Sequence, residues 1–331
     1  MKTLVTGGCG FIGSHLVERL LRERCEVVVL DNLSTGRFSN LKEVASHPNL
    51  HVVEKDVTQK EAIQGHFQGV DTVFHLAALA DIVPSIQRPL DYYHANVTGT
   101  ITVLEAAREA AVKRIVYAAS SSCYGIPDVF PTPETAPVRP EYPYALTKYL
   151  GEQIVFHWGK VYKMKTVSLR LFNVYGPRSR TTGTYGAVMG VFLAQKLSEK
   201  PLTIVGDGTQ TRDFTYVTDV AEAFWLASQK DLEGTMLNVA SGGTHSVNQL
   251  VELIGGSTVH IPKRPGEPDC TFADITKIQR LLGFCPKVPF EAGVKEMLSR
   301  ISEWSDAPVW TPETIAAATK EWFSYLTAPQ R

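Results

Sequence analysis

The sequence KTLVTGGCGFIGSHLVERLLRERCEVVVLDN, residues 2–32, indicates how the chain folds. Its first and last parts, residues 2–6 and 26–30, are short runs rich in valine and leucine, the composition of strands buried on both faces. Between them, residues 14–24 carry apolar side chains at helical spacing. The stretch therefore predicts a strand, a helix and a second strand, with a glycine-rich loop after the first strand.

The same alternation continues toward the middle of the chain. It predicts further strands at residues 51–54, 72–78, 114–119 and 166–171, helices at 97–111 and 144–162, and a proline-rich loop at 126–143. Repeated strand–helix–strand units predict an α/β fold, a Rossmann-type doubly wound parallel sheet. We expect a dinucleotide-binding domain at residues 1–171, to which 214–238 return. A smaller substrate-binding lobe at 172–213 and 239–331 would end in a helical extension.

Composition excludes several classes of protein. The 331 residues include 33 Lys+Arg and 34 Asp+Glu, a formal net charge of -1, so the chain lacks the basic excess of a nucleic-acid binder. No run of about 18 apolar residues predicts a membrane span, and no apolar leader follows Met1, so we expect a cytoplasmic protein. The five cysteines and nine histidines lack metal-ligand spacing, and we expect reduced thiols and no metal.

The glycine-rich loop has the spacing of a dinucleotide site. Gly7, Gly10 and Gly13 allow a tight turn and a close approach of the backbone to a pyrophosphate, which the following helix N-terminus would attract. Asp31 ends the second strand, where a carboxylate accepts hydrogen bonds from the adenosine ribose and disfavours a 2′-phosphate. The pattern therefore predicts NAD as cofactor. Asn32, Ser34 and Thr35 either touch the ribose or form an Asx-type turn, and Asp56 and Val57 are expected at the adenine.

Tyr144 and Lys148 lie four residues apart, on one face of a predicted helix. A nearby cation lowers the pKa of a phenol, so Tyr144 could serve as a base near neutral pH. Ser120, Ser121 and Ser122 follow a predicted strand at the sheet edge where this fold places its chemistry. A hydroxyl there could relay a proton from a sugar, and the alternative is that these serines only cap a turn.

Taken in order, these motifs resemble the extended short-chain dehydrogenase/reductases, and more narrowly the NAD-dependent nucleotide-sugar epimerase/dehydratase family. The resemblance covers about residues 1–300 and rests on TGGCGFIG (6–13), DNLS (31–34), HLAA (75–78), NVTGT (96–100), SSSCYG (120–125), Tyr144 with Lys148, and LRLFNVYGP (169–177). It implies catalytic roles for Ser120, Ser121, Tyr144 and Lys148. It also implies further NAD contacts at Phe11, Ile12, Gly36, Leu76, Ala77, Ala78, Asn96, Ser120, Tyr144, Lys148 and Leu171.

The residue at position 122 bears on the reaction. Relatives that are 4,6-dehydratases or uronate decarboxylases carry a glutamate at the place of Ser122, and the resemblance implies that this acid helps the dehydratases eliminate water. Without it, the chain is best interpreted as a UDP-sugar 4-epimerase that forms a transient 4-keto sugar. The alternatives are a dehydratase or UDP-glucuronate decarboxylase with an acid from elsewhere, and an NAD-sensing regulator without catalysis.

The resemblance also implies contacts with the substrate's nucleotide. It gives Asn173 a diphosphate contact and Glu267 the ribose. Arg212 in GDGTQTRDF (206–214) and Arg264 in KRPGE (263–267) would bind the phosphates through their planar guanidinium groups, and Ser122 the sugar. Arg178 and Arg180 are further candidates and keep a UDP-hexuronate open.

Four positions depart from the UDP-galactose epimerases. Ala80 replaces a lysine and Leu171 an aromatic residue, while Cys270 and Thr271 stand where those enzymes can have a bulky tyrosine. The small residues predict room for a 2-acetamido group, so UDP-N-acetylglucosamine would be accepted beside UDP-glucose. By analogy with relatives, the helices at 97–111 and 144–162 would form a homodimer contact.

Overall fold

The computed structural model describes residues 1–179 and 187–326 and is built around a seven-stranded parallel sheet. The strands lie in the order β11-β6-β5-β4-β1-β2-β3, and every neighbouring pair is parallel. Their bounds are β1 Lys2–Thr6, β2 Glu26–Asp31, β3 Leu50–Glu54, β4 Thr72–His75, β5 Arg114–Ser120, β6 Lys165–Leu171 and β11 Thr235–Val239. The predicted doubly wound sheet is therefore confirmed, and β11 returns to it from the second half of the chain.

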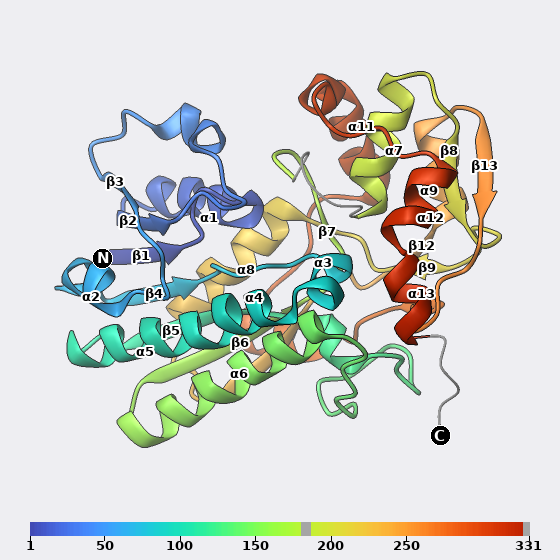
Figure 1. Cartoon of the computed structure of the whole chain (residues 1–331). Coiled ribbons are helices and arrows are strands. Elements are labelled where there is room, and N and C mark those ends of the chain that lie inside the picture. Colours follow the sequence, from blue (N-terminus) through green and yellow to red (C-terminus); the bar gives the residue numbers. More distant parts are fainter. Residues whose placement is uncertain (180–186, 327–331) are drawn as a thin grey trace.

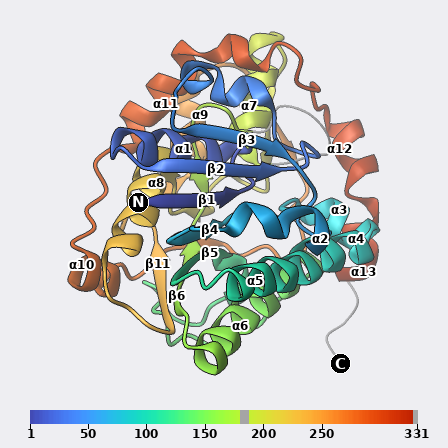
Figure 2. The same cartoon turned by 90° about the vertical axis from the view of Figure 1, so that its left-hand side faces the viewer.

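Helices cover both faces of this sheet (Figures 1 and 2). On one face, Leu16 of α1 and Phe224 of α8 pack with Val5 of β1 in a single hydrophobic core. On the other face, Val103 of α5 and Val155 of α6 pack with Leu4. The helices and 3-10 segments around the sheet are α1 Phe11–Arg22, η1 Phe38–Val44, α2 Lys60–Ile63, η2 Gln64–Phe67, α3 Ile82–Gln87, α4 Pro89–Tyr93, the π-helical η3 His94–Thr98, α5 Gly99–Glu109, η4 Ser121–Tyr124, α6 Pro143–Tyr162, α8 Val217–Gln229 and α10 Thr276–Leu282.

The strand predicted at residues 72–78 ends early, at His75. The backbone amide of Leu76 still donates to the carbonyl oxygen of Thr6 in β1 at 3.1 Å, and the amides of Leu76 and Ala77 each donate to the hydroxyl of Thr6 at 3.2 Å. The chain there crosses the glycine-rich loop so closely that a Cβ on Gly7 would lie 2.8 Å from the nitrogen of Ala77. The end of β4 thus forms one wall of the loop.

A smaller lobe lies beyond the carboxyl ends of the strands and has a hydrophobic core of its own. Phe192, Phe214, Leu250 and Trp304 belong to that core. The elements of the lobe are β7 Val174–Tyr175, α7 Val188–Leu197, β8 Leu202–Val205, β9 Thr211–Arg212, β10 Thr215–Tyr216, β12 His245–Ser246, α9 Val247–Ile254, β13 Thr258–Ile261, β14 Cys270–Thr271, α11 Phe290–Ser299, η5 Ile301–Trp304, α12 Pro312–Ala318 and α13 Lys320–Leu326. The domain boundaries themselves stay a prediction.

Across residues 1–179 and 187–326, the structure holds no helix with both the length and the apolar character that a bilayer crossing requires.

Candidate active site

The glycine-rich loop joins β1 to α1 and is shaped by contacts that exclude side chains. Gly7 has φ +72°, a conformation that favours glycine. A Cβ on Gly13 would overlap the carbonyl oxygen of Gly7, so the helix starts directly against the turn. No acidic residue lies in the first turn of α1, whose positive dipole end is therefore available to an anion.

Asp31 closes the far side of the loop. Its carboxylate accepts backbone hydrogen bonds from Cys9 at 2.9 Å and from Leu33 at 2.8 Å. Burial raises the pKa of Asp31, and the two amides act in the opposite direction. Gly36 approaches so closely that a Cβ there would lie 2.9 Å from both carboxylate oxygens. Gly36 thus shapes the loop beside Asp31.

A pocket of about 310 Å³ opens between the loop and the ends of β2, β3 and β4. Most of the predicted cofactor residues line it, namely Gly7, Gly10, Phe11, Ile12, Gly13, Asp31, Asn32, Ser34, Thr35, Asp56, Val57, Leu76, Ala77 and Ala78. The sequence prediction missed Arg37, Asn40, Lys55, Thr58, Leu79, Ala80, Asp81, His94, Ala95 and Ala118. Several of these flank predicted residues in the chain, so the neighbourhood of each motif was the available signal. The size, the glycine cradle and the buried acid fit the adenosine and pyrophosphate of NAD.

Gly36, Asn96, Ser120, Tyr144, Lys148 and Leu171, which were also predicted to contact NAD, do not line this pocket. Asn96 is 1% exposed, and its amide joins both backbone groups of Leu79 and the hydroxyl of Thr147 at 2.8–3.0 Å. It therefore holds the pocket-lining loop against α6 and does not line the pocket. Leu171 is buried in the core of the sheet at the end of β6.

The structure brings Ser120 and Tyr144 together. Ser120 ends β5 and Tyr144 lies in the first turn of α6, and a hydrogen bond joins their side-chain hydroxyls. Burial raises the pKa of Tyr144, while the bond to Ser120 lowers it. Desolvation of the phenolate thus outweighs the stabilising bond, and the lowering of this pKa by a nearby positive charge stays a prediction.

Lys148 lies one turn further along α6 and is 4% exposed. Its ammonium nitrogen lies 4.4 Å from the centre of the Tyr117 ring. Burial lowers the pKa of Lys148 to about 7, and the carboxylate of Glu152 acts against that change. Glu152 in turn pairs with Arg170 at 2.5 Å, and both side chains are almost fully buried.

Ser122 and Tyr142 extend this group toward the lobe. The hydroxyl of Ser120 lies 3.0 Å from that of Ser122, and a second bond joins Ser122 to Tyr142. The ring of Tyr142 stacks parallel to that of Tyr144, with centroids 6.5 Å apart. The sequence did not predict a role for Tyr142, because its position two residues before Tyr144 gave no signal of a functional site. Ser121 lies in η4 and is partly exposed.

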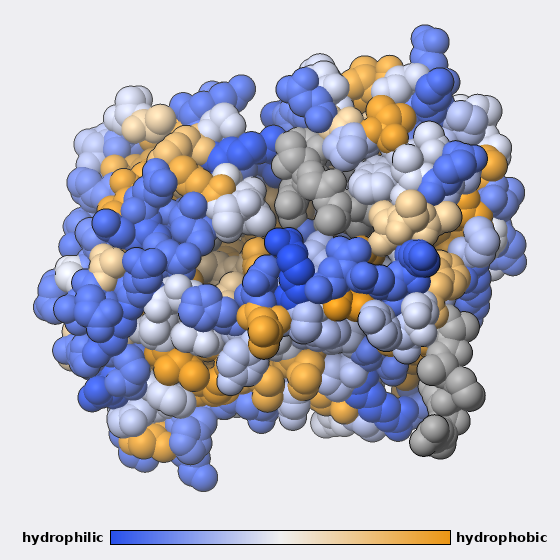
Figure 3. All heavy atoms as spheres, viewed as in Figure 1, coloured by the Kyte–Doolittle hydropathy of each residue, from blue (hydrophilic) through white to orange (hydrophobic). Residues whose placement is uncertain are grey.

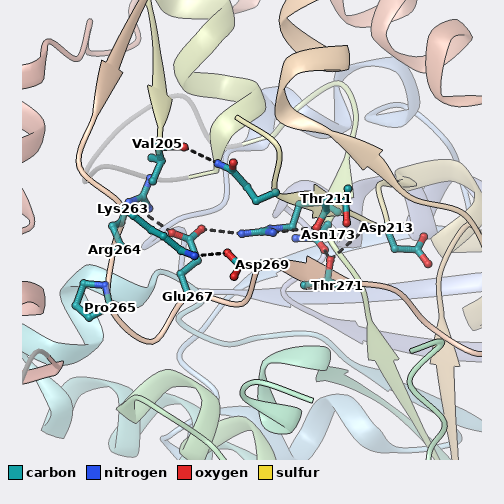
Figure 4. Close-up of polar contacts among 12 residues, drawn as sticks. Asn173, Val205, Thr211, Asp213, Lys263, Arg264, Pro265, Glu267, Asp269 and Thr271 are labelled. Carbon is teal, nitrogen blue, oxygen red and sulfur yellow. Dashed lines mark hydrogen bonds and ion pairs between the residues drawn. The ribbon is translucent and has the colours of Figure 1, made fainter. Parts of the chain in front are cut away.

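The lobe gathers the predicted phosphate-binding residues around one carboxylate (Figure 4). Glu267 accepts a hydrogen bond from Arg212 at 3.0 Å and lies 3.6 Å from the Nε of Arg264. Nearby, the hydroxyl of Thr271 donates to the Asn173 side chain at 2.6 Å. Pairing of β9 with β14 brings these segments together, although they are far apart in the chain.

Arg178 has different partners. Its guanidinium pairs with Glu18 of α1, its backbone amide donates to Glu303, and it lines the nucleotide pocket. The structure therefore does not join Arg178 to the pair of arginines at Glu267. Arg180 lies outside the described residues.

A glycine-cradled pocket with a buried acid, beside a hydrogen-bonded serine and tyrosine, is typical of enzymes that use NAD on a Rossmann fold, and this chain is an enzyme of that class. It belongs to the NAD dependent epimerase/dehydratase family, whose sequence model matches residues 3–240. The predicted family and cofactor are therefore confirmed.

Several named UDP-sugar epimerases are similar to this chain. A putative UDP-glucose 4-epimerase of Methanocaldococcus jannaschii is 36% identical over 303 residues, which cover 89% of this chain and 97% of the relative. The UDP-glucose 4-epimerase of Thermotoga maritima, solved with UDP-glucose, is 34% identical with a TM-score of 0.86, covering 92% of this chain and 99% of that one. A UDP-N-acetylglucosamine 4-epimerase of Methanobrevibacter ruminantium, solved with UDP-N-acetylmuramic acid, is 32% identical with a TM-score of 0.86, covering 91% and 98%. Such 4-epimerases are isomerases.

Proposed function

We propose that this enzyme interconverts the C4 epimers of a UDP-sugar through a transient 4-keto sugar. The observation that carries the proposal is the hydrogen-bonded pair of Ser120 and Tyr144, continued by a serine at position 122. The pair can take a proton from a sugar hydroxyl, and Ser122 is no acid near neutral pH. A ketone formed there is reduced again without elimination.

Each residue of the site has a task in this reaction. Tyr144 takes the proton from the 4-hydroxyl and returns it, while the Ser120 hydroxyl stabilises the phenolate. NAD would be held by the glycine-rich loop and Asp31, and when bound it would supply the hydride acceptor for C4 in its oxidised form and the hydride donor in its reduced form. The positive charge that Lys148 carries below its pKa of about 7 also favours phenolate. Arg212 and Arg264, which both face Glu267, would bind the diphosphate, with Asn173 beside them.

Two small side chains in the lobe, Cys270 and Thr271, favour a sugar with a 2-acetamido group. Cys270 and Thr271 form β14, next to Arg212 of β9, and neither is bulky. We therefore propose UDP-glucose and UDP-galactose as substrates, together with UDP-N-acetylglucosamine. A hexuronate is less well supported, because the guanidinium of Arg178 already pairs with Glu18.

A lyase is the second candidate, since one carboxylate does lie near the base. Asp81 lines the nucleotide pocket, and its charge raises the pKa of Tyr144. An acid in that position could assist a 4,6-dehydratase or a UDP-glucuronate decarboxylase. The products of the two reactions differ, so one experiment separates them.

We also propose a homodimer that is formed through α6 and its neighbours. Leu146, Val161 and Tyr162 of α6 are 44–49% exposed, and Leu90 of α4 is 80% exposed. Figure 3 shows apolar side chains on the lower face, over α5 and α6. A second copy of the chain would cover them. Light scattering should give twice the mass of one chain. We also propose a cytoplasmic location.

The experiment incubates the purified protein separately with UDP-glucose, UDP-N-acetylglucosamine and UDP-glucuronate, without added cofactor, and identifies products by NMR. A C4 epimer of the first two supports the proposal. A 4-keto-6-deoxy sugar or a UDP-pentose supports the lyase. Epimerisation of UDP-glucose with no turnover of the acetamido sugar contradicts the argument from Cys270 and Thr271.

A further inference from the structure

The C-terminal helix α13 lies outside residues 3–240, the part of the chain that the family model matches. It packs against α3, which begins directly after the pocket-lining residue Asp81 (Figures 1 and 2). Its Trp322 is 3% exposed, whereas Tyr325, one turn later, is 67% exposed. The helix therefore buries this tryptophan against the site and leaves the other aromatic ring in solvent.

Trp322 contacts the loop that carries the phosphate-binding candidates. Its indole N–H donates to the carbonyl oxygen of Pro265 at 2.8 Å. The guanidinium carbon of Arg264 lies 5.5 Å from the centre of its ring. Leu326 packs next to Gly266, where an added Cβ would lie 3.6 Å from its methyl carbon. Three successive loop residues, 264–266, thus lie against α13, just before Glu267.

Trp322 also contacts the catalytic end of the site. Its ring packs on that of Tyr142, with centroids 6.4 Å apart and an interplanar angle of 54°. Tyr142 stacks on Tyr144 in turn and bonds to Ser122. The side chain of Trp322 therefore lies between the proposed base, Tyr144, and loop residues 264–266.

We propose that Trp322 is a positioning residue that holds Arg264 and Tyr142 in fixed positions relative to each other. The diphosphate of the substrate would then bind at Arg264 while the sugar hydroxyl lies at Tyr144. The proposal rests on the function proposed above. It assigns a role in substrate binding to a helix beyond the matched region. The hydrogen bond to Pro265 sets the loop, and the ring contact with Tyr142 supports the phenol of Tyr144.

The test compares Trp322→Ala and Trp322→Phe with the wild type, and uses Tyr325→Ala as a matched control on the same helix. Binding of UDP to the purified, NAD-containing protein is measured by calorimetry, and KM and kcat are measured with UDP-glucose per bound NAD. Trp322→Ala should weaken UDP binding and raise KM by about tenfold or more, since it loses a hydrogen bond and an aromatic contact. It should also lower kcat.

Trp322→Phe keeps the ring and loses the N–H donor. It should restore kcat close to the wild-type value and weaken UDP binding about 3- to 10-fold. Tyr325→Ala should match the wild type in all three quantities. UDP affinity and KM within twofold of wild type in both Trp322 variants overturn the inference, even if the variants melt earlier. A wild-type protein that neither binds UDP nor epimerises a UDP-sugar overturns the proposed function instead.

Discussion

The ammonium nitrogen of Lys148 lies 4.4 Å from the centre of the Tyr117 ring, in the buried base of the site. In the folded protein the pKa of Lys148 is lowered to about 7, because burial disfavours its charge. An unfolded chain holds this proton more tightly. Folding therefore costs free energy wherever the unfolded lysine is charged, and the cost shrinks as pH rises above 7.

We expect Lys148→Met to remove this dependence. The free energy of unfolding of the wild type, minus that of the variant, should rise between pH 7 and 9 by at most about 1.4 kcal/mol per pH unit. Below pH 7 the difference should stay level. Urea unfolding at pH 6, 7, 8 and 9 measures it, and a constant difference from pH 7 to 9 would show that the lysine is not desolvated. The variant should lose turnover.

Ser120→Ala tests the bond that lowers the pKa of Tyr144. Without that bond the pKa of the phenol rises, and the phenolate becomes scarcer at a given pH. The rising limb of kcat/KM against pH should move to higher pH, and the rate at pH 7 should fall about 10- to 100-fold. An unshifted limb with a lower plateau would mean that Ser120 acts on the sugar alone.

Asp31→Asn tests the cofactor site. The carboxylate is buried beside the loop, and its loss would remove the charge that we propose accepts hydrogen bonds from the ribose and repels a 2′-phosphate. NAD released from the purified protein by acid should fall well below one per chain, with a Kd about 10- to 100-fold higher. Tighter discrimination against NADP than in the wild type would contradict this role. Circular dichroism checks that the variant folds.

The buried pair of Glu152 and Arg170 supports the floor of the site. Glu152 accepts from Arg170 at 2.5 and 3.0 Å and from Ser168 at 2.7 Å. Glu152→Leu leaves the Arg170 charge uncompensated and should cost about 3–5 kcal/mol of unfolding free energy. The double variant Glu152→Leu, Arg170→Met should cost less than the sum of the two single changes. Additive costs, measured by urea unfolding, would show that the two groups do not interact.

Patterns within short stretches of sequence predicted most strands of the sheet and most residues that line the nucleotide pocket. The glycine-rich loop and the acid at the end of β2 belong to one strand–helix–strand unit, so their geometry follows from a short continuous stretch of chain. Of the predicted NAD contacts, those in the loop and after β2 to β4 line the pocket, except Gly36. The predicted end of β4 was wrong because the amide of Ala77 donates to the side chain of Thr6, which is distant in the chain.

Features that depend on tertiary packing were out of reach. The side-chain amide of Asn96 forms hydrogen bonds with Leu79 and Thr147, and the sequence around Asn96 does not reveal these partners. Burial raises the pKa of Tyr144 and outweighs the hydrogen bond with Ser120, which lowers it. The sequence predicted a helical extension at the C-terminus, but only the fold shows that Trp322 reaches Tyr142 and Pro265.

In the proposed reaction, hydride leaves C4 of the sugar and returns to C4 within the same site. Incubation of the protein with UDP-glucose that carries deuterium at C4, without added NAD, tests it most directly. NMR and mass spectrometry of the product should show the C4 epimer with deuterium retained at C4, and Tyr144→Phe should give no product while its bound NAD stays in place. Deuterium lost to solvent from C4, or a 4-keto-6-deoxy sugar as product, would contradict the claim.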